Sequence, residues 1–209
     1  MLTVSRKKSF CKVLGPGIRS VIWFHGCGKN CPGCIVRTAG ENSDYERLSP
    51  VQLADWVKEN QPVEGITLSG GEPFDQPPND LMNFLKIIRS DTDLSVLCYT
   101  GYQLDELQTN DNLRDLLNCI DVLIDGQYEI ENDNNQLWRG SENQKFHFLT
   151  DRYKQHAIEW FAARGREIEI EVDISGHFSL SGLPQKYFME NLTGKLREKG
   201  VSLHFDEEE

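Results

Sequence analysis

The chain has 209 residues, of which 38% are hydrophobic and 26% are charged, and its net charge is −11. This composition supports one buried core and excludes a disordered chain. No apolar run reaches the roughly 20 residues that a membrane span needs, and the acidic balance disfavours nucleic acid or an anionic membrane as the main partner. Because the N-terminus also lacks the features of a secretory signal, we expect a cytoplasmic protein.

Strands and helices alternate along the first 126 residues. Residues 20–26 form an apolar, β-branched run that predicts a buried strand. Ser49, Pro50 and Gln52 match the N-cap, N1 and N3 positions of a helix that ends near Pro62. The next expected elements are a strand over 65–73, a helix over 78–89, a strand over 94–102, helical turns over 104–118 and a strand over 120–126. This alternation predicts βαβ units and a parallel sheet.

Each of the strands predicted between residues 20 and 126 runs into a polar, glycine-bearing turn. The four turns read HGCG, SGGE, YTGY and IDGQ. The carboxyl ends of parallel strands lie at one edge of a sheet, and that edge carries the chemistry in such folds. We therefore expect the four turns to form one site.

The last third of the chain predicts an αβ extension. Residues 129–149 have weak periodicity and are interpreted as an ordered loop. The expected elements after it are an amphipathic helix over 151–164, strands over 166–174 and 177–184, a helix over 184–199 and a short strand over 201–205. We divide the chain into a core (1–150) and a C-terminal extension (151–209) packed on it.

Six cysteines occur at positions 11, 27, 31, 34, 98 and 119. A reducing cytosol disfavours disulfides, and the scattered Cys11, Cys98 and Cys119 are expected in the core. Cys27, Cys31 and Cys34 instead crowd into eight residues. Thiolates suit iron–sulfur clusters, zinc and copper(I). A [4Fe–4S] cluster on three cysteines keeps one iron open for a small molecule, whereas a structural zinc site needs a fourth ligand, for which His25 is the candidate.

The cysteine spacing is that of radical S-adenosylmethionine (SAM) enzymes, and further segments extend the likeness. They are GPGIRSVIWFHGCGKNCPGC (15–34), LSGGEPF (68–74), YTGYQLDEL (99–107), IDVLIDGQY (120–128) and LWRGSENQ (137–144). In their sequence and in their order, these segments resemble those of the glycyl-radical activase family, in particular the activating component of anaerobic ribonucleotide reductase. The resemblance implies a shortened, open (βα) partial TIM barrel, a [4Fe–4S] cluster and SAM as cofactors.

The resemblance also implies a set of cofactor-binding residues. Gly33 lets the backbone wrap round the cluster, and Gly70, Gly71 and Glu72 match the segment that lines the methionine part of SAM. Glu72 stands where many members have Asp. The resemblance further places Thr100 beside the SAM pocket, Asp125 at the ribose hydroxyls and Arg139 at the SAM carboxylate. Taken alone, Asp125 would suit an ordinary turn and Arg139 a surface loop.

The function implied is reductive cleavage of SAM to a 5′-deoxyadenosyl radical, which installs a glycyl radical on a partner enzyme. The large subunit of anaerobic ribonucleotide reductase is the expected partner, with a flavodoxin- or ferredoxin-type electron donor. Hydrogen abstraction needs no acid or base, and the cofactors carry the difficult chemistry. One alternative is a radical SAM enzyme that modifies a peptide or small metabolite. The other is a non-catalytic zinc- or cluster-binding module.

Two departures from the family pattern bear on the activase role. Ile35 and Val36 follow the last cysteine, where activases commonly have an aromatic residue and Asn. The extension over 151–209 exceeds the short activases. We expect it to pack on the sheet and lengthen it beside the barrel edge, leaving the cluster face accessible.

Overall fold

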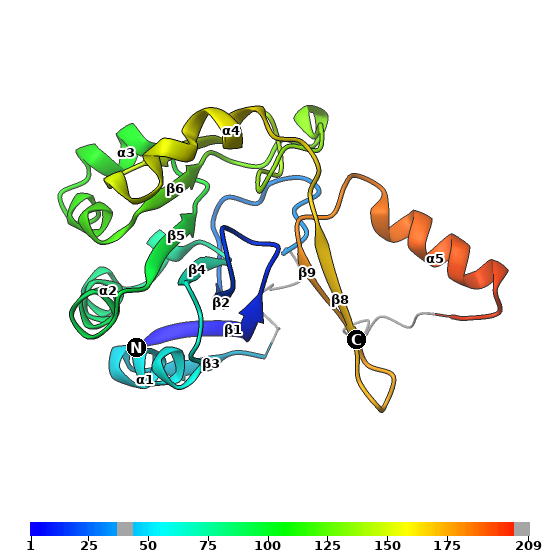
Figure 1. The fold of residues 1–209 in the computed structure, drawn as a ribbon, viewed down its shortest axis with the longest axis horizontal. Coiled ribbons are helices and arrows are strands. Elements are labelled where there is room, and N and C mark those ends of the chain that lie inside the picture. The colour runs from blue at the N-terminus through cyan, green and yellow to red at the C-terminus, as the bar shows by residue number, and fades with distance from the viewer. Residues whose placement is uncertain (37–43, 203–209) are drawn as a thin grey trace.

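The structure, a computed structural model, describes residues 1–36 and 44–202. A seven-stranded sheet in the order β3-β1-β2-β4-β5-β6-β7 forms its centre, and a separate sheet pairs β8 with β9 (Figure 1). The strands of the large sheet are β1 (Leu2–Cys11), β2 (Arg19–Phe24), β3 (Glu46–Leu48), β4 (Gly65–Gly70), β5 (Ser95–Tyr99), β6 (Val122–Asp125) and β7 (Lys145–Phe148).

The centre of the large sheet is parallel, and its edges are antiparallel. Strands β2, β4, β5 and β6 pair in parallel, which confirms the predicted α/β class. Strands β1, β3 and β7 run antiparallel to their neighbours. The interpretation of 129–149 as a loop throughout was wrong, because β7 within it pairs with β6 from Val122↔Phe148 to Asp125↔Lys145.

Helices α1 (Pro50–Glu59), α2 (Pro78–Asp91) and α3 (Leu104–Thr109) follow β3, β4 and β5. The capping box predicted for α1 is present, since the Ser49 hydroxyl accepts from the Gln52 N–H and the Gln52 side chain accepts from the Ser49 N–H. The helical turns expected over 104–118 divide into α3 and a 3₁₀ segment, Arg114–Cys119. Buried leucines of α1 and α2 pack with Ile66, Leu68 and Val96 in the main core.

The other face of the parallel strands shows layers that follow from the register. One layer aligns Arg19, Gly65 and Ser95, and the next aligns Val21, Thr67, Leu97 and Val122. Leu97 and Val122 pack in a cluster with Phe146 of β7 and Trp160. Both faces of the parallel strands are therefore covered, as their near-continuous apolar sequences require.

The C-terminal extension forms two helices and a hairpin. The helix expected over 151–164 divides into a 3₁₀ segment (Asp151–His156) and α4 (Ala157–Ala162), and the last helix is α5 (Phe188–Glu198). Strands β8 (Ile168–Val172) and β9 (Phe178–Gly182) make their own sheet, so the expectation that they lengthen the large sheet was wrong. Residues 201–202 are not in a strand, and the remainder of the strand expected over 201–205 lies outside the described residues.

Charged side chains attach the hairpin to β1. The Arg6 guanidinium donates to the Leu180 carbonyl at 2.7 Å and to the Ser181 hydroxyl at 3.0 Å. Lys8 Nζ lies 3.1 Å from Glu169 and 2.8 Å from Glu171. The hairpin thus rests on β1 through the polar face of its strands, whereas Trp160 of the extension packs in the apolar cluster with Phe146. No helix within 1–36 and 44–202 combines the length and the apolar composition that a membrane crossing needs.

Candidate metal and cofactor site

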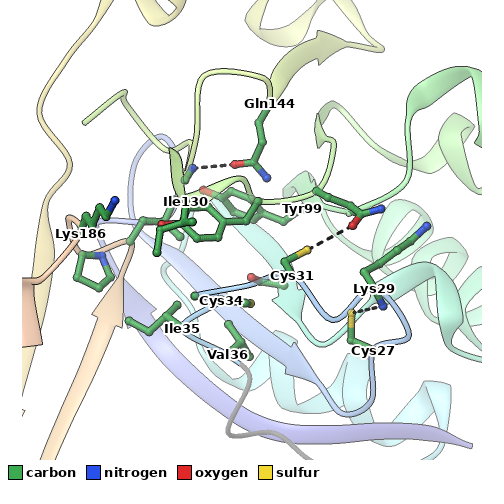
Figure 2. A pocket seen from close by; sticks show the side chains of 18 of the residues that line it. Cys27, Lys29, Cys31, Cys34, Ile35, Val36, Tyr99, Ile130, Gln144 and Lys186 are labelled. Atoms are coloured by element: carbon green, nitrogen blue, oxygen red, sulfur yellow. Dashed lines mark hydrogen bonds between the residues drawn. The ribbon is translucent and has the colours of Figure 1, made fainter. Parts of the chain in front are cut away.

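One cavity of about 420 Å³ at the carboxyl edge of β4 and β5 contains the three clustered cysteines (Figure 2). It brings together eight of the ten residues predicted for the site, namely Cys27, Cys31, Gly33, Cys34, Gly70, Gly71, Glu72 and Thr100. Asp125 and Arg139 do not line it, although their neighbours Gly126 and Gly140 do. The predicted convergence of the turns at one edge is confirmed for the cysteine loop and the turns that follow β4, β5 and β6, the last through Gly126 and Gln127.

The cysteine loop follows β2 and presents its thiols toward this cavity. Cys27 is exposed, and Cys31 and Cys34 are partly buried, while Cys11 and Cys98 lie in the core as expected. The Lys29 N–H donates to Cys27 Sγ at 3.4 Å, and the Cys31 thiol lies 3.7 Å from Gln127 Oε1. Partial burial raises the pKa of the Cys27 thiol. A bound cation would reverse that shift, because coordination deprotonates a thiol.

The arrangement fits a cluster with three protein ligands. Cysteines that hold a [4Fe–4S] cluster bind separate irons, so their sulfurs surround a cube and do not meet at one point. Within the described part of the chain, no three His, Cys, Asp or Glu side chains are placed as ligands of a single ion. The His25 ring, the candidate fourth zinc ligand, stacks on Tyr45 at 4.4 Å and does not line the cavity.

Gly70 and Gly71 bring the end of β4 against the start of the cysteine loop. The Gly71 N–H donates to the Phe24 carbonyl at 2.7 Å, and the Glu72 N–H donates to the Gly26 carbonyl at 2.8 Å. A Cβ on Gly71 would lie 1.9 Å from the Gly26 oxygen. Gly70 has a φ of +95°, which other residues rarely adopt. Glycine is therefore needed here for the approach of two backbones, a reason that the sequence prediction did not include.

Glu72 connects the turn after β4 to the turn after β5. Its carboxylate is 1% exposed and accepts from the Thr100 hydroxyl at 2.8 Å, the Gly101 N–H at 2.7 Å and the Phe74 N–H at 3.0 Å. Burial outweighs these hydrogen bonds and raises the pKa of Glu72 to about 7. Since both oxygens have partners within the protein, Glu72 positions the two turns that line the cavity.

Asp125 is buried at the end of β6 and does not line the cavity. Its Oδ2 accepts from the Leu104 N–H at 2.8 Å and lies 2.8 Å from His147 Nε2. Burial alone would raise the pKa of Asp125, but the contacts with His147 and Leu104 hold it below its ordinary value. In this structure the carboxylate is engaged with β7 and α3, so contact with a ribose stays a prediction.

Arg139 packs against the rings of Phe146 and Phe161. Its guanidinium donates to the carbonyls of Gln144 and Phe161, both at 3.2 Å, and lies 5.0 Å from the centre of the Phe146 ring. It is 5% exposed. The predicted contact with the SAM carboxylate therefore has no support from the position of this side chain, and it stays a prediction.

The cavity also includes residues that the sequence prediction missed. Tyr99 and Ser69 line it from β5 and β4, and Lys29 lies over the Tyr102 ring at 3.3 Å beside it. Residues 183–190 of the extension, here called the extension wall, complete the lining. This differs from the expectation that the extension leaves the cluster face clear. No periodicity in the sequence indicates that this segment returns to the cysteines.

Comparison with known proteins agrees with the cysteine geometry. A family model described as a 4Fe-4S single cluster domain matches residues 13–147. The chain belongs to this family. The match contains all three clustered cysteines and the turns after β4, β5 and β6, and it ends before the extension.

Curated relatives narrow the family further. The anaerobic ribonucleoside-triphosphate reductase-activating protein of Enterobacteria phage T4 is 30% identical over 149 residues, which are 69% of this chain and 92% of the phage protein. Its counterpart in Escherichia coli K12 is 32% identical over 145 residues, 66% of this chain and 92% of that protein. This member of the 4Fe-4S family is thus a radical SAM enzyme of the activase-like type.

A third relative covers more of the chain at lower identity. The 7-carboxy-7-deazaguanine synthase of Clostridium acetobutylicum is 25% identical over 185 residues, which are 83% of this chain and 75% of that protein. That alignment is longer than the two with the activating proteins and must include residues outside the 13–147 match. At 83% of the chain, the alignment with the synthase reaches into the extension, which the 13–147 family match does not include.

Proposed function

We propose that Cys27, Cys31 and Cys34 hold a [4Fe–4S] cluster and that the adjoining cavity binds SAM. The observation that carries this proposal is a single cavity lined by three thiols and by the backbone turns that end β4 and β5. When bound and reduced, the cluster would supply the electron that cleaves SAM to methionine and a 5′-deoxyadenosyl radical. The large sheet is then the open partial barrel of radical SAM type, with 1–150 as core and 151–209 as extension.

The protein's own residues bind, orient and shield. Gly70 and Gly71 line the cavity at the turn after β4, where the family resemblance places the methionine end of SAM. Glu72 fixes the neighbouring turn at Thr100 and Gly101. A cavity of about 420 Å³ is within the range of small-molecule sites. The extension wall covers one side of the cavity, and such cover helps to keep a reactive carbon radical from side reactions with water.

The radical would remove a hydrogen atom from the Cα of a glycine in a partner protein. The relatives are named as activating proteins of an anaerobic ribonucleoside-triphosphate reductase. We propose an enzyme of that kind as the partner, a flavodoxin- or ferredoxin-type protein as electron donor, and the cytoplasm as the location. Neither nucleic acid nor membrane has a role in this proposal.

The test is electron paramagnetic resonance under anaerobic conditions. The cluster-loaded protein is reduced and mixed with SAM and the glycyl-radical protein from the same genome. We expect a glycyl doublet and release of 5′-deoxyadenosine, both dependent on SAM. The matched control is the partner protein with its radical-bearing glycine replaced by alanine, which should give no doublet. A protein that binds zinc and releases no 5′-deoxyadenosine would contradict the proposal.

A second function has specific support from the extension. Residues 183–190 line the cavity, and the synthase relative aligns with more of this chain than the activating proteins do. These observations favour a radical SAM enzyme that encloses a peptide or a small metabolite. Release of 5′-deoxyadenosine with no doublet on any glycyl-radical protein of the genome would decide for this alternative.

A further inference from the structure

Helix α5 carries an apolar stripe that begins in the cavity. Phe188 and Met189 line the cavity beside the cysteines. Leu192 and Leu196 follow on the same helix face, at spacings of three and four residues. These four residues, here called the α5 stripe, are each partly buried, and no residue of α5 is fully buried.

The stripe is not covered by the rest of the core. Figure 1 shows α5 beyond the β8–β9 hairpin, apart from the helices that pack on the large sheet. No buried hydrophobic cluster within residues 1–36 and 44–202 includes a residue of α5. A partly exposed apolar helix face that joins no buried cluster of the described residues indicates an interaction surface.

The length of the α5 stripe favours a polypeptide as the molecule that binds this surface. The eleven residues of α5 extend about 16 Å at 1.5 Å per residue. A small metabolite would need only the cavity end of the stripe, at Phe188 and Met189. Leu196 lies two helical turns farther on, so the full stripe suits an occupant that runs from the outside into the cavity.

Charge indicates the chemistry of the occupant. The whole chain has a net charge of −11, yet residues 183–200 carry four basic side chains and only two acidic ones. The basic side chains are Lys186, Lys195, Arg197 and Lys199. Lys186 also lines the cavity. A basic border around an apolar stripe is complementary to apolar side chains flanked by acidic ones.

We propose that the α5 stripe is the docking surface for an acidic-flanked, apolar polypeptide segment of the protein that bears the target glycine. The segment lies along α5 and enters the cavity between the extension wall and the cysteine loop. This proposal rests on the proposed activase function and names how its protein substrate is recognised. The extension then determines the partner, and the core performs the chemistry common to the family.

The experiment measures binding of the full-length glycyl-radical protein from the same genome to the cluster-loaded chain. Leu192→Glu places a charge on the stripe, and Asn191→Glu places the same charge on the exposed face next to it. We expect Leu192→Glu to weaken binding about tenfold or more, because the apolar contact that Leu192 would make with the docked segment is lost. Asn191→Glu should leave the dissociation constant within about twofold. Leu192→Ala, which adds no charge, should weaken binding in the same direction.

The outcomes separate this proposal from the proposed function. Equal binding by wild type, Leu192→Glu and Asn191→Glu would overturn docking on the stripe, as would a wild type that does not bind the partner. Release of 5′-deoxyadenosine by the wild type without partner tests SAM cleavage independently. Iron content and melting temperature confirm that each variant is folded and loaded. Lys195→Glu should weaken binding at low salt and lose its effect at high salt, as charge complementarity requires.

Discussion

At their amino ends, strands β2, β4 and β5 enclose the guanidinium of Arg19, whereas the carboxyl ends of β4 and β5 border the cavity with three thiols. Arg19 is fully buried, and its guanidinium donates to the Thr67 hydroxyl at 2.7 Å and to the Ser95 hydroxyl at 2.9 Å. It also donates to three backbone carbonyls, those of Ser95 at 3.1 Å, Pro16 and Ile66. Every nitrogen of this side chain has a partner. The amino ends of these strands are therefore closed by hydrogen bonds within the chain.

The carboxyl ends of these strands differ, because they border a cavity. The thiols of Cys27, Cys31 and Cys34 face a cavity, and the buried Tyr99 hydroxyl has no hydrogen-bond partner within the described residues. Burial raises the pKa of both Cys27 and Glu72. The comparison shows that one set of strands is joined by buried hydrogen bonds at its amino ends and borders a cavity at its carboxyl ends.

Replacing one of the three clustered cysteines should have the largest effect, because it removes a proposed cluster ligand from the carboxyl edge. Cys31→Ala should reduce iron from about four atoms per chain to nearly none, because three cysteines is the minimum for the proposed cluster. Its SAM cleavage should fall to background. Cys98→Ala is the matched control, since Cys98 is buried in the main core and should keep its iron. Iron analysis and absorbance near about 400 nm measure both. Equal iron in the two variants would remove Cys31 from the site.

Replacing Arg19 should lower the stability of the fold without removing the proposed cluster site. Arg19→Met keeps the apolar stem but leaves buried carbonyl and hydroxyl groups without a donor. We expect the free energy of unfolding to fall by about 3–5 kcal/mol. Urea unfolding of the metal-free, reduced chain measures this, and Arg114→Met, at an exposed position, should change it by about 0.5 kcal/mol or less. The fraction of the Arg19→Met variant that remains folded should still bind iron. Loss of iron without loss of stability would contradict the division between the two edges.

The carboxyl edge was largely predictable from local sequence. Three cysteines in eight residues and a glycine turn after each predicted strand are short-range signals, and parallel pairing aligns strand ends automatically. The capping box at Ser49 and Gln52 is equally local. Such features need no knowledge of distant residues.

The other features depend on contacts between distant segments. Strand β1 has no clean alternation of buried and exposed residues, so only its pairing with β2 and β3 defines it. Strand β7 has four residues, too few for a period. The burial of Arg19 follows from its alignment with Gly65 and Ser95, which lie 46 and 76 residues away. The return of residues 183–190 to the cysteines likewise follows from the attachment of the hairpin to Arg6 and Lys8.

Glu72 offers a pH test of the carboxyl edge. Its folded pKa of about 7 lies above the ordinary value of 4.5, so the folded state holds the proton more tightly than the unfolded state. The stability from this group is complete below pH 4.5 and is lost as pH rises through about 7. Over that range the wild type should lose about 3 kcal/mol more than Glu72→Gln, which does not titrate. Urea unfolding of the metal-free chain at several pH values measures it, and parallel pH profiles would contradict the raised pKa.

Replacing Arg139 should have the smallest effect, and it tests whether the proposed SAM site at the carboxyl edge extends as far as this residue. The structure directs its guanidinium to the Gln144 and Phe161 carbonyls, and Arg139 itself does not line the cavity, although Gln144 does. A lysine cannot donate to both carbonyls in the same plane, so Arg139→Lys should lower the free energy of unfolding by about 1 kcal/mol.

The KM for SAM should stay within about twofold of the wild type in Arg139→Lys, because the guanidinium does not line the cavity. Arg164→Lys is the matched control, since Arg164 also donates to the Phe161 carbonyl but is exposed, and it should change neither quantity. Steady-state release of 5′-deoxyadenosine gives the KM, and urea unfolding gives the stability. The opposite pattern, a KM raised tenfold at unchanged stability, would place Arg139 at the SAM carboxylate, as the family resemblance implies. In that case the loop over 137–144 would have to rearrange when SAM binds, and the cavity described here would be its state before binding.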